Sequence, residues 1–359
     1  MTGAGAGPTA PGRGPAGGGS LRLWLALLAA VGLLTFATSG VGPFGISYEN
    51  ILRVWLSPFF HDAASGVGDS ERYIVVHIRL ARACLALMVG ASLGLAGAVY
   101  QGVLLNPLAD PFTLGISAGG ALGASLAILF GWGGVHFAGM SGLPVAAFAG
   151  SMGALYLVYM LGRVDGKVHS TTLVLAGIMV STFLSAWISL LKSLHEDSVS
   201  TIVFWIMGSL SGKGWLHTLL IAPYLLAGSA TILAYARELD CMSLGEVQAM
   251  QLGVDVPRIR LTLLVAASLI TAAAVAVSGV IGFIGLVVPH IVRLCIGPGH
   301  RRLLPLSLLL GGVLLLISDT LARSILPGGQ ELPVGVLTAI LGGPFFCHLL
   351  LRRKKNIQL

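Results

Sequence analysis

Long apolar runs separated by short polar segments dominate the hydrophobicity pattern of this chain. Each run is about 20 residues, the length that crosses a bilayer core as a helix rising about 1.5 Å per residue. The pattern predicts ten such helices, at 21–40, 80–104, 112–131, 143–161, 172–191, 215–236, 261–281, 283–297, 303–321 and 333–351. We therefore predict an all-α membrane protein in which residues 21–359 form a single ten-helix domain. The preceding segment 1–20, rich in Gly, Pro and Ala, is predicted to be a disordered tail.

The seventh and eighth apolar runs meet at Gly279, Gly282 and Gly285 with no polar loop between them. A single helix over 261–297 would be roughly 55 Å long, whereas the hydrocarbon core is about 30 Å thick. We expect the chain to break or reverse direction at these glycines.

The segment from Asn106 to Ala124, NPLADPFTLGISAGGALGA, interrupts the apolar pattern with two prolines, an Asn and an Asp before a Gly-rich helix resumes. Unpaired backbone groups in hydrocarbon cost several kcal/mol each, so such a turn lies at the interface or lines a protein-walled passage. Small residues at four-residue spacing flank it and predict close helix packing: Gly90, Gly94, Ala98 and Gly102 before it, and Gly119 and Gly123 within it.

Composition supports the membrane assignment, because 55% of the 359 residues are hydrophobic and only 10% are charged. The positive-inside rule then orients the chain, since 14 of its 21 Lys and Arg residues fall on one side when the N-terminus is cytoplasmic. With ten spans both termini are predicted to be cytoplasmic, in the inner membrane of the cell. This topology accounts for the basic pI, and no segment offers the basic and aromatic surface that nucleic-acid binding needs.

The predicted cytoplasmic loop from Arg237 to Arg260, RELDCMSLGEVQAMQLGVDVPRIR, is too long to be a simple turn. We expect two short helices, one from Ser243 to Leu252 and one at a turn around Val256, with Ser243 and Glu246 forming a capping box at the first and Gly253 ending it. The partly apolar Leu244, Val247 and Leu252 suit a docking surface for a soluble partner. An ordinary amphipathic connector fits the pattern equally well.

Catalytic and metal-binding chemistry finds no support in the sequence. Gly212-Lys213 resembles the end of a phosphate-binding loop, but Gly214 stands where Ser or Thr is needed. The histidines and carboxylates lack zinc-ligand spacing, and the four cysteines occur singly. We therefore expect no enzyme activity, no ATP site, no cofactor and no metal on this chain.

Five segments in unbroken order resemble the FecCD family, the permease subunits of ATP-binding-cassette (ABC) importers for vitamin B12, haem and ferric siderophores. They are RLARACLALMVGASLGLAGAVYQG (79–102), NPLADPFTLGISAGGALGA (106–124), SLGEVQAMQLGV (243–254), GFIGLVVPHIVRL (282–294) and DTLARSILPGGQELPVGVLTAILGGPFF (319–346). One departure is Ala81, which stands between the first two arginines where the family usually has Pro. The resemblance implies a BtuC-like, type II permease in which helices two to five and seven to ten are related by an inverted repeat.

The resemblance also implies partners and site residues. It implies a second permease subunit, with a homodimer expected, two ATPase subunits that hold ATP and magnesium, and a periplasmic or lipid-anchored binding protein. Arg79, Arg82 and Arg323 match positions that face acidic residues of the binding protein. The positions that match the ATPase coupling helices are Ser243, Leu244, Gly245, Glu246, Gln251, Leu252 and Gly253. Those that match the cytoplasmic gate are Asn106, Leu108, Ser170 and Thr171.

The expected mechanism is alternating access, in which ATPase closure moves the coupling helices and the gate helices then release cargo inward. Asp319 and Arg323, one helical turn apart, are predicted to offset each other's charge. The expected cargo is a ferric siderophore, with haem or vitamin B12 as the alternative. A secondary transporter would also show broken helices but would not need the 237–260 loop.

Overall fold

The structure is a computed structural model that describes residues 18–42, 44–58, 60, 66–134, 136–137, 140–164 and 167–357. Most of the predicted disordered tail lies outside the described residues. Its last three residues, 18–20, belong to the first turn of α1 (Gly18–Ser39).

An apolar helix occupies each of the ten predicted spans. Within the described part of the chain, six helical segments are long and apolar enough to cross a membrane, and four further apolar helices are shorter. In chain order the ten are α1, α4 (Ala81–Val103), α5 (Ile116–Leu129), α6 (Gly142–Leu161), α7 (Ser170–Leu194), α9 (Trp215–Ala234), α12 (Val256–Ser278), α13 (Ile284–Ile296), α14 (His300–Ala322) and α15 (Val334–Ile357). The predicted all-helical membrane fold is confirmed.

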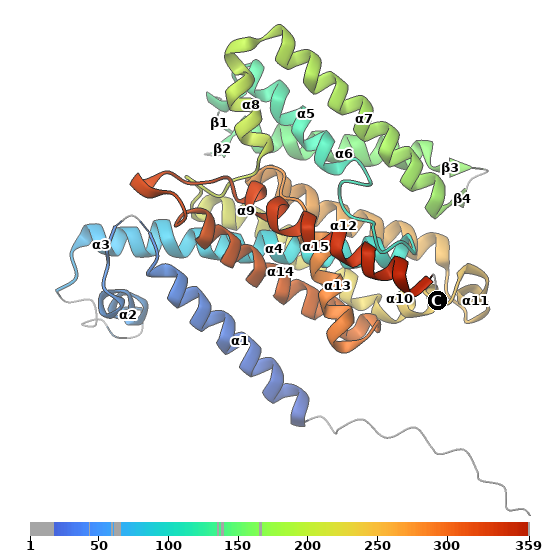
Figure 1. Cartoon of the computed structure of the whole chain (residues 1–359), viewed down its shortest axis with the longest axis horizontal. Helices are drawn as coiled ribbons and strands as arrows, with labels where there is room; N and C mark the ends of the chain where they lie inside the picture. Colours follow the sequence, from blue (N-terminus) through green and yellow to red (C-terminus); the bar gives the residue numbers. More distant parts are fainter. Residues whose placement is uncertain are drawn as a thin grey trace, which may run out of the picture.

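The helices form a bundle with two unlike ends (Figure 1). The green helices α5, α6, α7 and α8 (Val199–Ile206) form a layer over α4, α9, α12, α13 and α14, while α1 lies along the opposite side. At one end lie α2 (Tyr48–Leu56) and α3 (Asp69–Tyr73); at the other lie α10 (Ala236–Met242), α11 (Glu246–Gln251) and the C-terminus. We call these the α2–α3 end and the α10–α11 end.

Close glycine contacts hold α4 against α14. A Cβ added to Gly90 would lie 2.2 Å from the carbonyl oxygen of Gly311, and one added to Gly94 would lie 2.4 Å from that of Ser307. Only glycine permits this approach of the two backbones. The small-residue face predicted from the sequence is therefore a packing surface, and Gly119 makes a similar contact with Gly150 of α6.

The predicted break between the seventh and eighth spans is confirmed. Helix α12 ends at Ser278, and Gly279 and Phe283 both adopt positive φ angles, 71° and 68°, before α13 begins. The Cβ of a residue at position 279 would lie 2.3 Å from the carbonyl oxygen of Trp205. Both the backbone conformation and the space thus require glycine there.

The predicted spans at 21–40 and 80–104 leave residues 41–79 as a connecting loop, but helical structure already begins at Asp69 and runs to Val103. It includes a π-helical segment, η1 (Ile74–Leu80), between α3 and α4. The backbone N–H of Ala81 donates to the carbonyl of Ile78, a bond that Pro at this position could not make. This is one reason why the helix passes through the first arginine motif without a break.

The remaining elements are short. Two antiparallel two-stranded hairpins cap the ends of α6: β1 (His136–Phe137) pairs with β2 (Met140–Ser141), and β3 (Arg163–Val164) pairs with β4 (Lys167–Val168). Single 3₁₀ turns lie at η2 (Trp132–Gly134), η3 (Glu196–Ser198) and η4 (Pro327–Gly329).

Candidate functional site

Two buried arginines cap the C-terminus of α1 at the α2–α3 end. Arg79 donates from Nη1 to the carbonyl oxygen of Ser39 at 2.7 Å and from Nη2 to that of Phe44. Arg323 donates from Nη2 to the carbonyl oxygen of Thr38 at 3.0 Å. The last carbonyls of a helix lack intrahelical partners and carry partial negative charge, so two cations stabilise this terminus.

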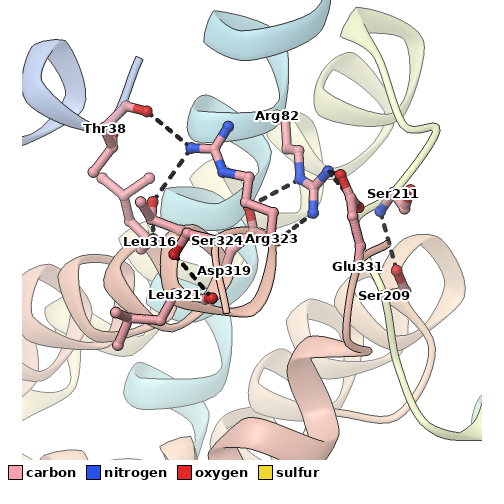
Figure 2. A network of polar contacts seen from close by, with 11 residues as sticks. Thr38, Arg82, Ser209, Ser211, Leu316, Asp319, Leu321, Arg323, Ser324 and Glu331 are labelled. Carbon is pink, nitrogen blue, oxygen red and sulfur yellow. Dashed lines mark hydrogen bonds and ion pairs between the residues drawn. The ribbon is translucent and has the colours of Figure 1, made fainter. Parts of the chain in front are cut away.

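A third arginine, Arg82, joins α4 to α14 and to the loop after it (Figure 2). It donates from Nε and Nη2 to the two carboxylate oxygens of Asp319, each at 2.9 Å. Its Nη1 donates to both carboxylate oxygens of Glu331, at 2.9 and 2.8 Å. The side chain of Asp319 is 1% exposed and that of Glu331 is 26% exposed.

The predicted charge compensation between Asp319 and Arg323 does not take the form of a direct ion pair. The carboxylate of Asp319 is taken up by Arg82, whereas the Arg323 guanidinium turns to Thr38 and to the hydroxyl of Thr320 at 3.3 Å. A bidentate arginine–carboxylate pair is stronger than a single contact within one helix, which explains the preference.

The three arginines predicted to face a binding protein therefore lie together, but inside the chain. Arg79, Arg82 and Arg323 are 3, 7 and 8% exposed. Their guanidinium groups hold α1, α4, α14 and the 323–333 loop in register. Glu331 is the partly exposed member of this arginine cluster.

The predicted helix from Ser243 to Leu252 is shorter in the structure, where α11 covers Glu246–Gln251, and a separate helix, α10, precedes it across a tight turn. The predicted capping box is wrong: Ser243 follows the end of α10, and its hydroxyl donates to the carbonyl of Asp240 at 2.6 Å. Gly245, at φ 114°, precedes α11 and permits the turn. Gly253, at φ 84°, ends α11 as predicted. The predicted turn around Val256 is instead the first turn of α12, and the Asp255 side chain caps it.

Four large apolar side chains are exposed on this segment. Leu244, Val247, Met250 and Leu252 have exposed fractions of 62, 60, 51 and 62%. Gln251 is exposed beside them. A compact apolar patch at one end of a membrane protein is typical of a protein contact surface.

Polar contacts tie α10 and α11 to different parts of the bundle. Asp240 of α10 accepts from the backbone N–H of His300, at 2.8 Å, and bonds its ring Nδ1 at 2.7 Å. Glu246 of α11 accepts from Nη2 of Arg260 on α12, and Arg260 donates from Nη1 to the carbonyl of Val168 at 2.6 Å. Arg260 is not among the site residues predicted from the sequence, because the residues that it contacts lie 14 and 92 positions away from it.

The loop between α4 and α5, predicted as a gate, is a folded turn near the α10–α11 end. The Asn106 side chain accepts from the backbone N–H of Leu108 at 2.9 Å, as expected for a turn former before Pro107. Leu108 is 43% exposed. Leu105 adopts a positive φ of 51°, a conformation that non-glycine residues take only when their surroundings enforce it.

Asp110 closes the same loop with its side chain. Its Oδ1 accepts from the backbone N–H groups of Phe112 and Thr113, both at 3.0 Å. Burial raises the pKa of the Asp110 carboxyl to about 6, against the opposing effect of these two bonds.

The structure brings the two halves of the predicted gate together. Ser170, at the start of α7, donates to the carbonyl of Val103 at 3.4 Å, and the exposed Thr171 follows it. Further along α7, a Cβ on Gly177 would lie 1.9 Å from the carbonyl oxygen of Thr113. Helix α7 thus packs directly on the 104–115 loop.

Among the described residues, no group of three or more His, Cys, Asp or Glu side chains could hold a metal ion. The sites consist of an arginine cluster at one end, an apolar patch at the other, and a folded loop and helix start near that patch.

Comparison with known proteins adds four findings. Residues 26–352 match the model of the FecCD transport family. The chain is 44% identical to the cobalamin import system permease protein BtuC of Halobacterium salinarum, over 80% of this chain and 76% of the relative. It is 38% identical to the hemin transport system permease protein HmuU of Yersinia pestis, over 92% and 95%. A solved inward-facing structure of a metal-chelate type ABC transporter aligns with a TM-score of 0.78 and 31% identity, covering 92% of this chain and 99% of that one.

Proposed function

We propose that this chain, which belongs to the FecCD transport family and is the permease subunit of an ABC importer, carries a bulky iron chelate into the cell. The family match over residues 26–352 carries the proposal. A ferric siderophore is the proposed cargo. The hemin relative and the metal-chelate transporter structure support an iron chelate, while the 44% identity to a cobalamin permease favours cobalamin as the second candidate.

The α10–α11 end is proposed to be cytoplasmic and to dock the ATPase. Two ATPase subunits, which would hold ATP and magnesium, would contact the apolar patch of Leu244, Val247, Met250 and Leu252. Ser243, Gly245, Glu246, Gln251 and Gly253 shape this coupling segment. The two permease subunits of the complex are proposed to be identical copies of this chain.

The opposite end is proposed to receive a binding protein that delivers the cargo. Because Arg79, Arg82 and Arg323 are engaged inside the chain, we propose that the arginine cluster supports the docking loops. A carboxylate of the binding protein would reach Arg82 only where Glu331 gives way. The gate of Asn106, Leu108, Ser170 and Thr171 would then open toward the cytoplasm after the ATPases close.

A charge placed in the apolar patch tests the assignment of the ATPase surface. Leu244→Glu is expected to abolish co-purification of the ATPase, because a carboxylate cannot be buried in an apolar contact without a partner. Leu56→Glu, a matched exposed leucine on α2 at the other end, is the control and should leave assembly intact. Uptake that persists in Leu244→Glu without a bound ATPase would favour a secondary transporter.

The cargo is tested on the substrate-binding protein that is proposed to deliver it to this chain. Its affinity for a ferric hydroxamate siderophore, hemin and cobalamin is measured by fluorescence quenching. Tight binding of the siderophore alone supports the proposal, whereas tight binding of cobalamin alone would replace it with the second candidate.

A further inference from the structure

Arg260 occupies a junction between the coupling segment and the gate. It lies in the first turns of α12, it is 3% exposed, and it faces two different segments. Nη2 donates to Glu246 of α11, and Nη1 donates to the carbonyl oxygen of Val168 at 2.6 Å. A single buried guanidinium thus joins α11 and α12, which are neighbours in the sequence, to β4, which lies 92 positions away from Arg260.

Because the charge of Arg260 is buried, both of its Nη contacts are needed to stabilise it. An arginine removed from water needs partners for its charge and its N–H groups. Its Nε, which is buried, has no hydrogen-bond partner in the described structure, so the group depends on the two Nη contacts. The planar, five-donor guanidinium can address two acceptors in different directions, whereas a lysine ammonium on a flexible stem would lack this fixed fork.

The Val168 contact leads directly to the gate. Val168 is the last residue of β4, and α7 begins two positions later at Ser170. Ser170 in turn donates to the carbonyl of Val103, where α4 ends and the 104–115 loop begins. A continuous set of contacts therefore runs from α11 through Arg260 to β4, to the start of α7 and to the loop.

Helix α10 is attached elsewhere. The Asp240 carboxylate binds the backbone and ring of His300 at the start of α14. The short turn at Gly245 separates α10 from α11. The two halves of the coupling segment are consequently bonded to different helices, and α11 is joined by the side chain of Arg260 to the segment that leads into α7.

We propose that Arg260 is the positioning residue that transmits displacement of α11 to the start of α7. The inference rests on the proposed function, since it requires an ATPase that moves α11. In this mechanism Glu246 couples α11 to Arg260, and the Val168 carbonyl couples Arg260 to the gate. Loss of Arg260 would leave ATP hydrolysis in place but disconnect it from the gate.

The test uses the complex with its ATPase in lipid nanodiscs and needs no cargo. A cysteine is placed at Gln248 of α11 or at Thr171, both exposed, after replacement of the four native cysteines. The rate of maleimide labelling is measured without nucleotide and with a non-hydrolysable ATP analogue. Without further changes, both sites are expected to change their labelling rate at least threefold on nucleotide binding.

Arg260→Met keeps much of the aliphatic stem but removes the fork. Gln248→Cys should still respond in this variant, while the response of Thr171→Cys should fall below about 1.3-fold and the rate of ATP hydrolysis should stay within twofold. Arg258→Met, an exposed arginine half a turn earlier, is the control and should behave as the unchanged complex. A Thr171→Cys response that survives in Arg260→Met would overturn the proposal.

A second variant keeps the test decisive if Arg260→Met does not assemble. Glu246→Gln changes a side chain that is 43% exposed and removes its charge without changing its size. It is expected to reduce the Thr171→Cys response at least twofold with the ATPase still bound, and an unchanged response would contradict the proposal. If the unsubstituted complex contains no ATPase, the proposed function itself fails.

Discussion

Arg82 of α4 and Asp319 of α14 form a bidentate ion pair, with two bonds of 2.9 Å, across 237 positions of sequence. The pair lies almost entirely out of contact with solvent, and Glu331 adds a second carboxylate on the outer side of the same guanidinium. Two helices and a loop meet at the charge of Arg82. Because Asp319 is buried and Glu331 is partly exposed, removing the charge of Asp319 should destabilise the protein more than removing that of Glu331.

Replacing Asp319 with Asn is expected to destabilise the protein by about 3 kcal/mol, since breaking a buried pair leaves Arg82 partly uncompensated. Glu331→Gln is the matched control. Its carboxylate is partly exposed, so the expected loss is about 1 kcal/mol or less. Chemical unfolding in detergent micelles, followed by tryptophan fluorescence, measures both values. Equal losses would show that the inner pair has no special role in stability.

The contact of α4 with α14 gives a second prediction. Gly90→Ala would place a Cβ 2.2 Å from the carbonyl oxygen of Gly311, so the helices must separate. We expect the free energy of unfolding to fall by about 1–3 kcal/mol, the range for overpacking in a core. The midpoint of thermal unfolding should also be lower.

The control for this change is another helical glycine. Gly153 of α6 has open space around the position of a Cβ. Gly153→Ala should therefore leave stability unchanged or raise it by up to about 1 kcal/mol, because alanine favours a helix. A similar loss in both variants would point to backbone flexibility as the cause instead of helix contact.

The raised pKa of the Asp110 carboxyl predicts how the stability of the protein depends on pH. Its folded-state pKa of about 6 lies above the ordinary value of 3.8, so the fold favours the protonated carboxyl. The cost of the buried charge is therefore fully present above pH 6 and declines as pH falls from 6 toward 4. When the pH is lowered from 7.5 to 5, the free energy of unfolding of the unsubstituted protein should rise by about 1 kcal/mol relative to that of Asp110→Asn.

Chemical unfolding of both proteins at the two pH values measures this difference. Asp110→Asn keeps a side-chain oxygen to accept from Phe112 and Thr113, so the loop geometry should persist. Parallel pH profiles for the two proteins would show that the Asp110 carboxyl is not the titrating group.

The helices were predictable because membrane crossing imposes a length and a composition that appear directly in the sequence. The break at Gly279 followed from length alone, and the glycine face at Gly90 and Gly94 followed from its spacing. Both are local patterns, and both are confirmed. The extent of helix from Asp69 to Leu80 was missed because its N-terminal turns carry charged residues that resemble a loop.

The partners of the site residues could not be predicted in the same way. Arg82 contacts Asp319 and Glu331, and Arg260 contacts Val168, through tertiary packing across long separations. Local rules instead paired Asp319 with Arg323 and Ser243 with Glu246. In both cases a tertiary bond to an arginine took the carboxylate, since a charge-assisted bond in a buried site is stronger than one on a helix surface.

The gate assignment leads to the last prediction. Leu108 lies in the 104–115 loop, is 43% exposed, and contributes only its backbone N–H to the bond with Asn106. Leu108→Ser should therefore leave folding and assembly with the ATPase intact while changing the rate of cargo uptake at least threefold. Uptake of an iron-55 ferric siderophore into proteoliposomes that contain the complex and its binding protein measures the rate. Leu105→Ser, an equally exposed neighbour in the same loop with a positive φ angle, is the control for general loop disruption, and its effect should appear in stability as well. If Leu108→Ser lowers assembly and uptake together, the loop supports the fold and does not form the gate.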